Sequence, residues 1–365
     1  DKKEKFYADK ATLDSESDVR LSIIKEIHDR LQGPEENTPG AWSDFEYDFS
    51  GSTFFYPIDL TNSYYAKPIN FSGSTYQGGA DFTDSTYQDW AYFTGSTYKD
   101  VADFTGSTYQ DWADFSRSTY KGEANFSRST YQDWAYFTGS TYKGEANFSD
   151  STYQDWAYFT GSTYQEEAYF SGSTYKGWAD FTGSTYKGEA NFTGSTYKGR
   201  ANFTGSTYQE EAYFSRSTYK GRAYFIDSTY KGWAYFTDST YKGRAYFSLS
   251  TYKGGADFSR STYKGGADFS RSTYKGRAYF TGSTYKGGAD FSRSTYKDVA
   301  DFSGSIFYQK VYFGADGDNS SFSRFTDCAP QFYDETNHKN TLFGSPNNDF
   351  TVENGRGYPI YRNFE

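Results

Sequence analysis

The chain has 365 residues, of which 22% are aromatic, and its 47 acidic and 37 basic side chains give a net charge of −10. One cysteine, Cys328, excludes an internal disulfide, and no apolar run reaches the length of a membrane-spanning helix. With only two histidines, His28 and His338, and no Cys/His cluster for zinc, we expect no enzymatic activity, no cofactor and no metal site.

Residues 1–48 precede any repeat and are expected to form a separate N-terminal segment. Ser17 or Asp18 can cap a short helix that runs to Leu31, and Gly33-Pro34 ends it. We expect an apolar stripe on this helix either to cap the first coil of the following domain or to bind another subunit. The residues of the stripe are Ile23, Ile24, Ile27 and Leu31.

Residues 49–313 repeat an eleven-residue unit of the form Ala-Asp-Phe-Thr-Gly-Ser-Thr-Tyr-Lys-Gly-X. A phenylalanine recurs at every eleventh position from Phe71 to Phe302, and the same step extends to Phe49 and Phe313, which makes 25 units. A second aromatic residue, mostly tyrosine, follows five residues later. A fixed period of this kind predicts a stacked array in which each unit packs against its neighbours.

Each half of the unit predicts a short strand with one aromatic face. In Ala80-Asp81-Phe82-Thr83, small and aromatic residues alternate with polar ones, which places Ala and Phe on the inner face. Strands this short suit a solenoid, where each strand pairs with the equivalent strand of the next coil. We expect about 12 coils of 22 residues, because tryptophan recurs with that period and should form one stacked column. Its positions are Trp90, Trp112, Trp134, Trp156 and Trp178.

The pattern of a small residue, then Asp or Asn, then Phe, then Ser or Thr resembles the pentapeptide-repeat family, in its eleven-residue (five plus six) variant. The resemblance implies an all-β, right-handed, four-sided β-helix with Phe and Tyr inside. Half of the central residues here are tyrosine, where the family usually has Leu or Phe, and a buried hydroxyl needs a hydrogen-bond partner. The inward serine two residues earlier, such as Ser85 for Tyr87, is our candidate for that partner.

Residues 314–365 lose the period but keep many aromatics between Gly, Asn, Asp and Pro. This composition is too aromatic for a solvated tail. We therefore expect the segment either to cover the last coil or to contact a neighbouring molecule. The residues that we assign to such an assembly contact are Phe343, Phe350, Tyr358 and Tyr361.

The charges of the repeat are segregated along the sequence. Residues 49–211 carry 10 basic and 19 acidic side chains, whereas residues 212–313 carry 16 and 7. An acidic half and a basic half attract each other across an end-to-end junction. We therefore predict a non-enzymatic structural protein that polymerises head to tail with copies of itself through its terminal segments, with no nucleic-acid partner and no membrane insertion.

The alternative is a monomeric binding protein. The resemblance brings in one such role, because some pentapeptide-repeat proteins mimic DNA and bind topoisomerases, although the basic half of the repeat argues against it. Outward columns of threonine, such as Thr75, Thr86 and Thr97, suit ice binding as the other role. Lys or Gln flank these columns in place of a second threonine column.

The composition favours an extracellular or cell-surface location, because a chain with no methionine and one cysteine has little to oxidise. Its start at Asp1 is typical of a processed chain. Six asparagines fit the N-glycosylation pattern, although the repeat generates that pattern whenever Asn replaces Asp. These candidate acceptors for glycans are Asn70, Asn125, Asn147, Asn191, Asn202 and Asn319.

Overall fold

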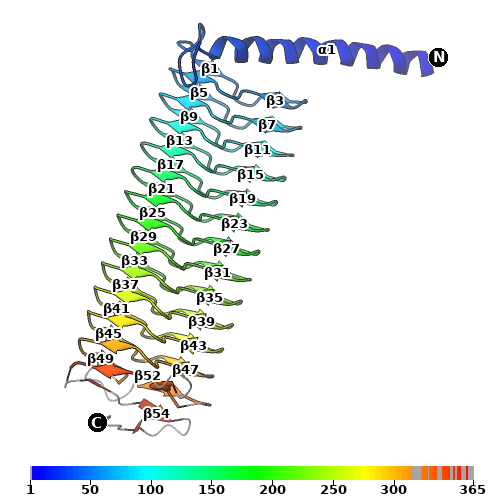
Figure 1. Cartoon of the computed structure of the whole chain (residues 1–365). Coiled ribbons are helices and arrows are strands. Elements are labelled where there is room, and N and C mark those ends of the chain that lie inside the picture. Colours follow the sequence, from blue (N-terminus) through cyan, green and yellow to red (C-terminus); the bar gives the residue numbers. More distant parts are fainter. Residues whose placement is uncertain are drawn as a thin grey trace. The chain divides into compact units, whose positions relative to one another are not determined.

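The computed structural model describes residues 2–314, 322–327, 329–334, 339–345, 348–349, 352–354 and 359–360. The chain forms two compact units, Asp1–Gln154 and Asp155–Glu365, and each is built from two- or three-residue strands stacked coil upon coil (Figure 1). The coils make a β-solenoid of about 12 turns. The predicted all-β solenoid, with four parallel sheets and one N-terminal helix, is therefore confirmed.

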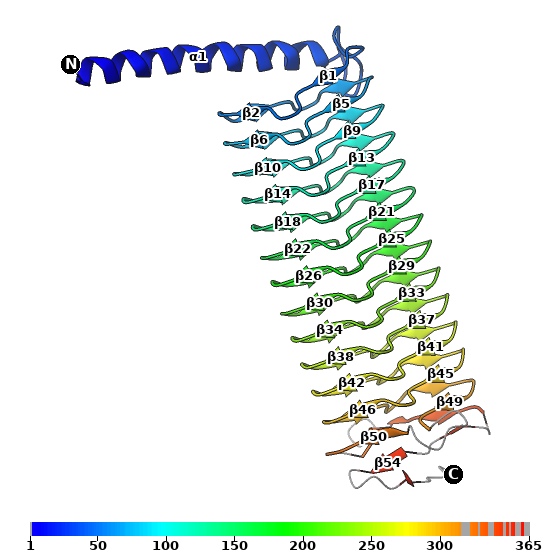
Figure 2. The same cartoon turned by 180° about the vertical axis from the view of Figure 1, so that it is seen from behind.

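In the first unit, helix α1 (Lys2–Leu31) precedes four sheets, which each coil of the chain visits in turn. The first sheet contains β1 (Tyr47–Asp48), β5 (Ile69–Asn70), β9 (Ala91–Tyr92), β13 (Ala113–Asp114) and β17 (Ala135–Tyr136). The second contains β2 (Thr53–Phe54), β6 (Thr75–Tyr76), β10 (Thr97–Tyr98), β14 (Thr119–Tyr120) and β18 (Thr141–Tyr142) (Figure 2). The third contains β3 (Ile58–Asp59), β7 (Ala80–Asp81), β11 (Ala102–Asp103), β15 (Ala124–Asn125) and β19 (Ala146–Asn147). The fourth contains β4 (Tyr64–Tyr65), β8 (Thr86–Tyr87), β12 (Thr108–Tyr109), β16 (Thr130–Tyr131) and β20 (Thr152–Tyr153).

The second unit repeats this arrangement. Its first sheet contains β21 (Ala157–Tyr158), β25 (Ala179–Asp180), β29 (Ala201–Asn202), β33 (Ala223–Tyr224), β37 (Ala245–Tyr246), β41 (Ala267–Asp268), β45 (Ala289–Asp290) and β49 (Val311–Tyr312). Its second contains β22 (Thr163–Tyr164), β26 (Thr185–Tyr186), β30 (Thr207–Tyr208), β34 (Thr229–Tyr230), β38 (Thr251–Tyr252), β42 (Thr273–Tyr274), β46 (Thr295–Tyr296), β50 (Ser323–Phe325), β54 (Val352–Asn354) and β55 (Pro359–Ile360).

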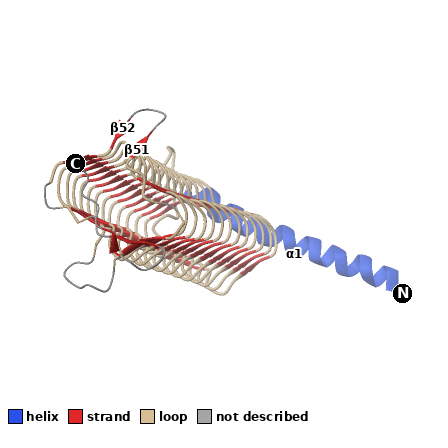
Figure 3. Ribbon diagram, turned by 90° about the horizontal axis from the view of Figure 1, so that it is seen from below, coloured by secondary structure: helices blue, strands red, loops and turns tan. Residues whose placement is uncertain are grey.

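The third sheet of this unit contains β23 (Ala168–Tyr169), β27 (Ala190–Asn191), β31 (Ala212–Tyr213), β35 (Ala234–Tyr235), β39 (Ala256–Asp257), β43 (Ala278–Tyr279) and β47 (Ala300–Asp301). The fourth contains β24 (Thr174–Tyr175), β28 (Thr196–Tyr197), β32 (Thr218–Tyr219), β36 (Thr240–Tyr241), β40 (Thr262–Tyr263), β44 (Thr284–Tyr285), β48 (Ile306–Phe307) and β53 (Leu342–Phe343). A separate antiparallel pair consists of β51 (Tyr333–Asp334) and β52 (Lys339–Asn340). Figure 3 shows the strands lying above one another in columns.

The register confirms a coil of 22 residues. Thr97 pairs with Thr119, and the ring of Phe82 stacks on that of Phe104, 22 residues on, with centroids 4.9 Å apart. The intervening Phe93 belongs to the opposite sheet of the coil and lies edge-to-face with Phe82. An eleven-residue coil is therefore excluded.

The tryptophan column forms within each unit. Trp90 stacks on Trp112, and Trp112 on Trp134, with ring centroids 5.7 and 5.2 Å apart. In the second unit Trp156 and Trp178 are also in contact, but their rings meet edge-to-face at 74°.

The core of each coil consists of the inward Ala, Phe and Tyr side chains. Ala113, Phe115 and Tyr120 are fully buried, and burying one such aromatic side chain contributes about 1.5–3 kcal/mol to stability. The chain turns at the second residue after each phenylalanine, which adopts a left-handed conformation. Glycine suits this position, as at Gly106 with φ 72°, but the side chain points outward and Arg117 also takes it with φ 54°.

The inward serines bond to the backbone. Ser85 Oγ donates to the Leu60 carbonyl oxygen at 3.0 Å and accepts from the Ser63 amide at 3.1 Å, which ties neighbouring coils together. Among the described residues, the hydroxyl of Tyr87 has no hydrogen-bond partner within 3.5 Å. Burial is the main reason that the pKa of Tyr87 lies well above its ordinary value.

The N-terminal helix is longer than predicted, because α1 begins at Lys2 and not near Ser17. Its extra turns are mostly charged and carry no apolar stripe, so hydrophobic periodicity could not reveal them. They contain good helix formers such as Lys, Glu, Ala and Leu. Further along the helix, ion pairs four residues apart support it, such as Glu26 with Arg30 at 2.8 Å.

Candidate assembly surfaces

The last turns of α1 are attached to the first coil. Leu31 is fully buried, and its carbonyl oxygen accepts a hydrogen bond from Ser43 Oγ at 3.3 Å. His28 Nε2 lies 2.8 Å from the Thr61 carbonyl oxygen and is part-buried. The histidine therefore contacts the first coil from the face that the helix turns toward it.

Away from Leu31 the helix projects past the coil and leaves an open edge (Figures 1 and 2). Strands β2 and β3 each begin a sheet, so one side of each has no neighbouring strand among the described residues. Phe54 on β2 is only half-buried, whereas Tyr76, one coil further, is 1% exposed. The missing strand beside β2 explains this difference, whereas Ile58 on β3, which lies against α1, is only 5% exposed.

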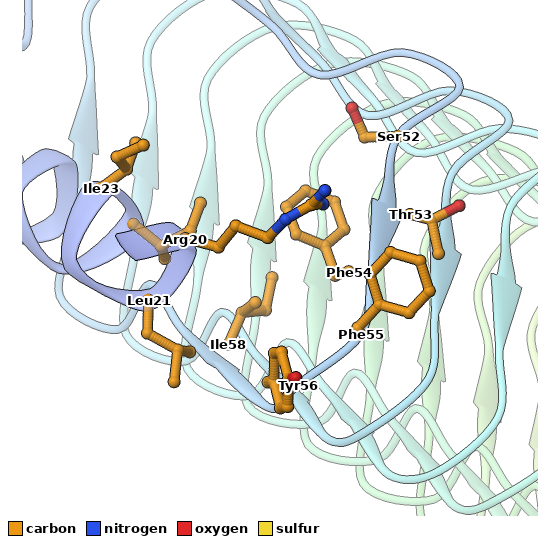
Figure 4. A pocket seen from close by; sticks show the side chains of 10 residues that line it. Arg20, Leu21, Ile23, Ser52, Thr53, Phe54, Phe55, Tyr56 and Ile58 are labelled. Carbon is orange, nitrogen blue, oxygen red and sulfur yellow. The ribbon is translucent and has the colours of Figure 1, made fainter. Parts of the chain in front are cut away.

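A pocket of about 250 Å³ lies between α1 and the first coil (Figure 4). Arg20 reaches from the helix into it, with its guanidinium carbon 5.5 Å from the centre of the Phe55 ring. Its apolar lining, which we call the N-terminal apolar patch, consists of Leu21, Ile23, Ile24, Phe54, Phe55, Tyr56 and Ile58.

The patch is solvent-exposed in large part. Ile23 and Phe55 are each 55% exposed, although both side chains are fully apolar. Of the four residues that the sequence placed in one stripe, only Leu31 is buried, Ile24 and Ile27 are half-buried and Ile23 is exposed. Contiguous exposed apolar residues of this kind are typical of interaction sites.

The C-terminal segment adds an irregular coil to the second unit. β50 pairs with β46, and β53 pairs with β48. Isolated bridges join Gln331 to Asp301 and Asp349 to Tyr312, so the added residues reach all four columns. Phe325 stacks on Tyr296 with ring centroids 4.6 Å apart.

The predicted assembly residue Phe343 belongs to this coil. Its ring lies 5.4 Å from that of Phe307 and is half-buried, so it covers the chain's own last regular coil. The other three predicted residues, Phe350, Tyr358 and Tyr361, lie outside the described residues. Beyond the irregular coil, β54 and β55 extend the second sheet.

The candidate glycan acceptors are engaged in turns. Asn70 Oδ1 accepts a hydrogen bond from the Ser72 amide at 3.0 Å, and Asn202 Oδ1 accepts one from the Thr204 amide at 3.3 Å. The same bond forms at Asn125, Asn147 and Asn191. Asn202 is only 8% exposed. Asn319 lies outside the described residues.

The described residues contain no group of three or more His, Cys, Asp or Glu side chains that could hold a metal ion. In the same part of the chain, no helix combines the length and the apolar character that a membrane span requires.

Residues 111–152 and 155–196 match the family model for pentapeptide repeats, with nine copies of the repeat. No curated protein and no solved structure matches the chain. The predicted resemblance to the pentapeptide-repeat family is confirmed, and the repeating solenoid is consistent with a pentapeptide-repeat protein. Solenoids of this kind are generally structural or binding proteins and not enzymes.

Proposed function

We propose that this protein is a non-enzymatic structural subunit that polymerises head to tail, with the N-terminal apolar patch of one copy bound to the C-terminal end of the next. The observation that supports the proposal is the exposure of Ile23 and Phe55 beside the open edge of the first coil. Among the described residues, no strand pairs with the outer side of β2 or β3, and strand edges and apolar surface both favour association.

The two ends of a solenoid differ, so a contact between them is heterologous and does not close by two-fold symmetry. Such a contact repeats without limit and gives a filament. Charge favours one direction, since residues 49–211 carry an excess of nine acidic side chains and residues 212–313 an excess of nine basic ones. Attraction across an exposed junction is screened within about 8–10 Å, so buried apolar contacts have to hold the joint.

The irregular C-terminal coil would provide the second surface of the junction, which contacts the N-terminal apolar patch of the next copy. Its Phe325 and Phe343 cover the last regular coil, which leaves β54 and β55 as the outermost strands of the second sheet. The surrounding sequence is rich in aromatics, among them Phe350, Tyr358 and Tyr361. We assign these strands and aromatics to the contact with the apolar patch of the next copy.

The test compares two variants at exposed apolar positions. The double variant Ile23→Asp and Phe55→Asp places two charges in the patch. The control Leu249→Asp places one charge on a coil of the second unit, at a side chain that is 50% exposed. We expect linear polymers by negative-stain microscopy for the wild type and the Leu249 variant, and no linear polymers for the patch variant. A wild-type chain that sediments as a monomer at high concentration, in low and moderate salt, overturns the proposal and leaves a monomeric binding protein.

We also place this polymer outside the cell, which the absence of methionine and the single cysteine support. Fractionating the source culture and probing the medium, the cell surface and the lysate with an antibody tests this location. Detection in the lysate alone contradicts it.

A further inference from the structure

One column of lysines follows an edge of the second unit. In six successive coils, the connection from the fourth sheet to the first begins with a lysine, and these residues are Lys176, Lys198, Lys220, Lys242, Lys264 and Lys286. All six are exposed. We call them the lysine ladder.

Backbone hydrogen bonds fix the spacing of the lysine ladder. The Lys198 amide donates to the Tyr175 carbonyl oxygen and the Lys220 amide to the Tyr197 carbonyl oxygen, both at 2.8 Å or less. The tyrosine rings beside them, Tyr197 and Tyr219, stack at 4.8 Å. Successive lysines are therefore one strand spacing apart, about 4.8 Å.

Arginines strengthen the positive charge of the same connections. Arg200 lies over the rings of Trp178 and Tyr224, at 4.8 and 4.4 Å, and Arg244 lies over Tyr246 at 5.2 Å. These cation–π contacts hold the guanidinium groups near the surface. From residue 176 to residue 288, none of these connections contains an acidic residue.

A column of glutamates follows the connection from the second sheet to the third in the same unit. It contains Glu167, Glu189 and Glu211 on three successive coils, which we call the glutamate ladder, with Glu166 and Glu210 beside them and one lysine, Lys187, among them. Burial, and then Glu211 and Glu167, raise the pKa of the Glu189 carboxyl above its ordinary value. The carboxylates are thus close enough to repel one another.

The two ladders cannot neutralise each other within one molecule. The lysine ladder follows the fourth sheet and the glutamate ladder follows the second, so they lie at opposite corners of each coil. The ion pair between Arg260 and Asp238 in this unit involves neither ladder. Like charges on neighbouring strands destabilise a sheet, so the ladders weaken the isolated molecule.

We propose that the lysine ladder of one copy binds the glutamate ladder of a second copy, side by side. Both ladders have the pitch of the same solenoid, so lysines and carboxylates stay matched over several coils without distortion. A single exposed ion pair contributes only about 0–1 kcal/mol, but a matched row of pairs acts as a network. Because the ladders lie at opposite corners, each bound copy presents a free ladder to a third, and the association continues laterally.

This inference does not depend on the proposed head-to-tail contact, and the test keeps the two apart. All measurements use the full chain with Ile23→Asp and Phe55→Asp, which blocks the end-to-end junction proposed above. In this background the first variant carries Lys198→Glu, Lys220→Glu and Lys242→Glu. The second carries Glu167→Lys, Glu189→Lys and Glu211→Lys. The matched control carries three basic-to-acidic substitutions at corners outside both ladders, Arg216→Glu, Arg271→Glu and Arg293→Glu.

Light scattering and microscopy then measure lateral association at about 0.02 M and about 0.5 M salt. We expect the unsubstituted ladders and the matched control to associate in low salt and to separate in high salt. We expect that neither ladder variant associates alone. Mixing the two variants should raise the light scattering at least tenfold above that of either variant by itself. Circular dichroism checks that each variant keeps the wild-type fold.

Two results overturn the proposal. One is that the ladder substitutions make no difference, either because all variants associate equally or because the chain with unsubstituted ladders does not associate at all. The other is that the unsubstituted ladders stay monomeric but bind a sulfated polysaccharide or duplex DNA in a manner that the Lys198, Lys220 and Lys242 substitutions abolish. That result assigns the lysine ladder to an external polyanion in place of a second copy.

Discussion

The ring of Phe181 lies 4.8 Å from the ring of Phe203, one coil further on, and the two planes are within 2° of parallel. Phe159 stacks on the other side of Phe181 at the same 4.8 Å. Each coil therefore rests on its two neighbours, and the stability of the array is approximately a sum of contacts between adjacent coils.

Removing one ring of this column should be costly. Phe181→Ala is expected to destabilise its region by roughly 3–5 kcal/mol, from lost burial and the cavity that remains. Thr185→Ala, at a half-buried outward position of β26, should cost far less. Chemical unfolding and hydrogen exchange across residues 159–225 measure both, and equal unfolding midpoints would contradict the inward orientation of the phenylalanines.

Gly221 allows close contact between successive coils. A Cβ atom at this position would lie 2.1 Å from the Gly199 carbonyl oxygen, whereas one at Gly288 would meet its first neighbour, the Lys310 carbonyl oxygen, at 3.6 Å. We expect Gly221→Ala to lower the thermal midpoint by several degrees, since backbone atoms have to move. Gly288→Ala should leave it nearly unchanged, and a larger loss at Gly288 would refute this interpretation.

The glutamate ladder makes stability depend on pH. The raised pKa of Glu189 means that folding favours its protonated form. Its contribution to stability is fully present below the ordinary glutamate pKa of about 4.3 and is lost as pH rises through the raised value. We therefore expect Glu189→Gln to stabilise the protein at neutral pH, by less than about 1 kcal/mol.

Denaturant titrations at neutral and acid pH check this prediction. The stabilisation by Glu189→Gln should shrink as the pH falls. The control Glu35→Gln removes an exposed carboxylate outside the repeat and should show no such trend. An unchanged gain at acid pH would argue against repulsion within the ladder.

The burial of Asn202 limits where glycans can be attached. Its side chain is 8% exposed and its Oδ1 accepts from the Thr204 amide, so an enzyme that acts after folding should not reach it. Intact-mass measurement on natively sourced protein gives 41.6 kDa for the unmodified 365-residue chain. An excess mass that maps to Asn202 would show that modification precedes closure of the coil.

Sequence alone predicted the coil but not the ends. The 22-residue recurrence of tryptophan identified the register, because residues stacked in one column share an environment, as Trp90 and Trp112 do. The early turns of α1 carry no apolar stripe, and no period could reveal them. The contact of His28 with Thr61 depends on where the helix lies against the coil, which no local pattern contains.

The sequence period does not reveal the C-terminal coil, because insertions separate its aromatic residues. Phe325, Phe332 and Phe343 continue the aromatic columns of Tyr296, Phe302 and Phe307, but the segments between them are longer than in the repeat. Equal spacing in space therefore corresponds to unequal spacing along the chain. The only signal in the sequence was the aromatic residues between Gly, Asn and Pro. They indicated that the segment is buried, but not which column each aromatic residue continues.

The outward side chain at each left-handed corner has a consequence for how such a chain evolves. Gly, Asp, Asn, Arg and Leu249 all occupy this position with φ between 51° and 72°, while the buried phenylalanine two residues earlier scarcely varies. A coil can thus be duplicated or lost by unequal recombination and then acquire new surface residues without a new packing problem. Related genes, or alleles of this one, are expected to differ by whole multiples of 22 codons.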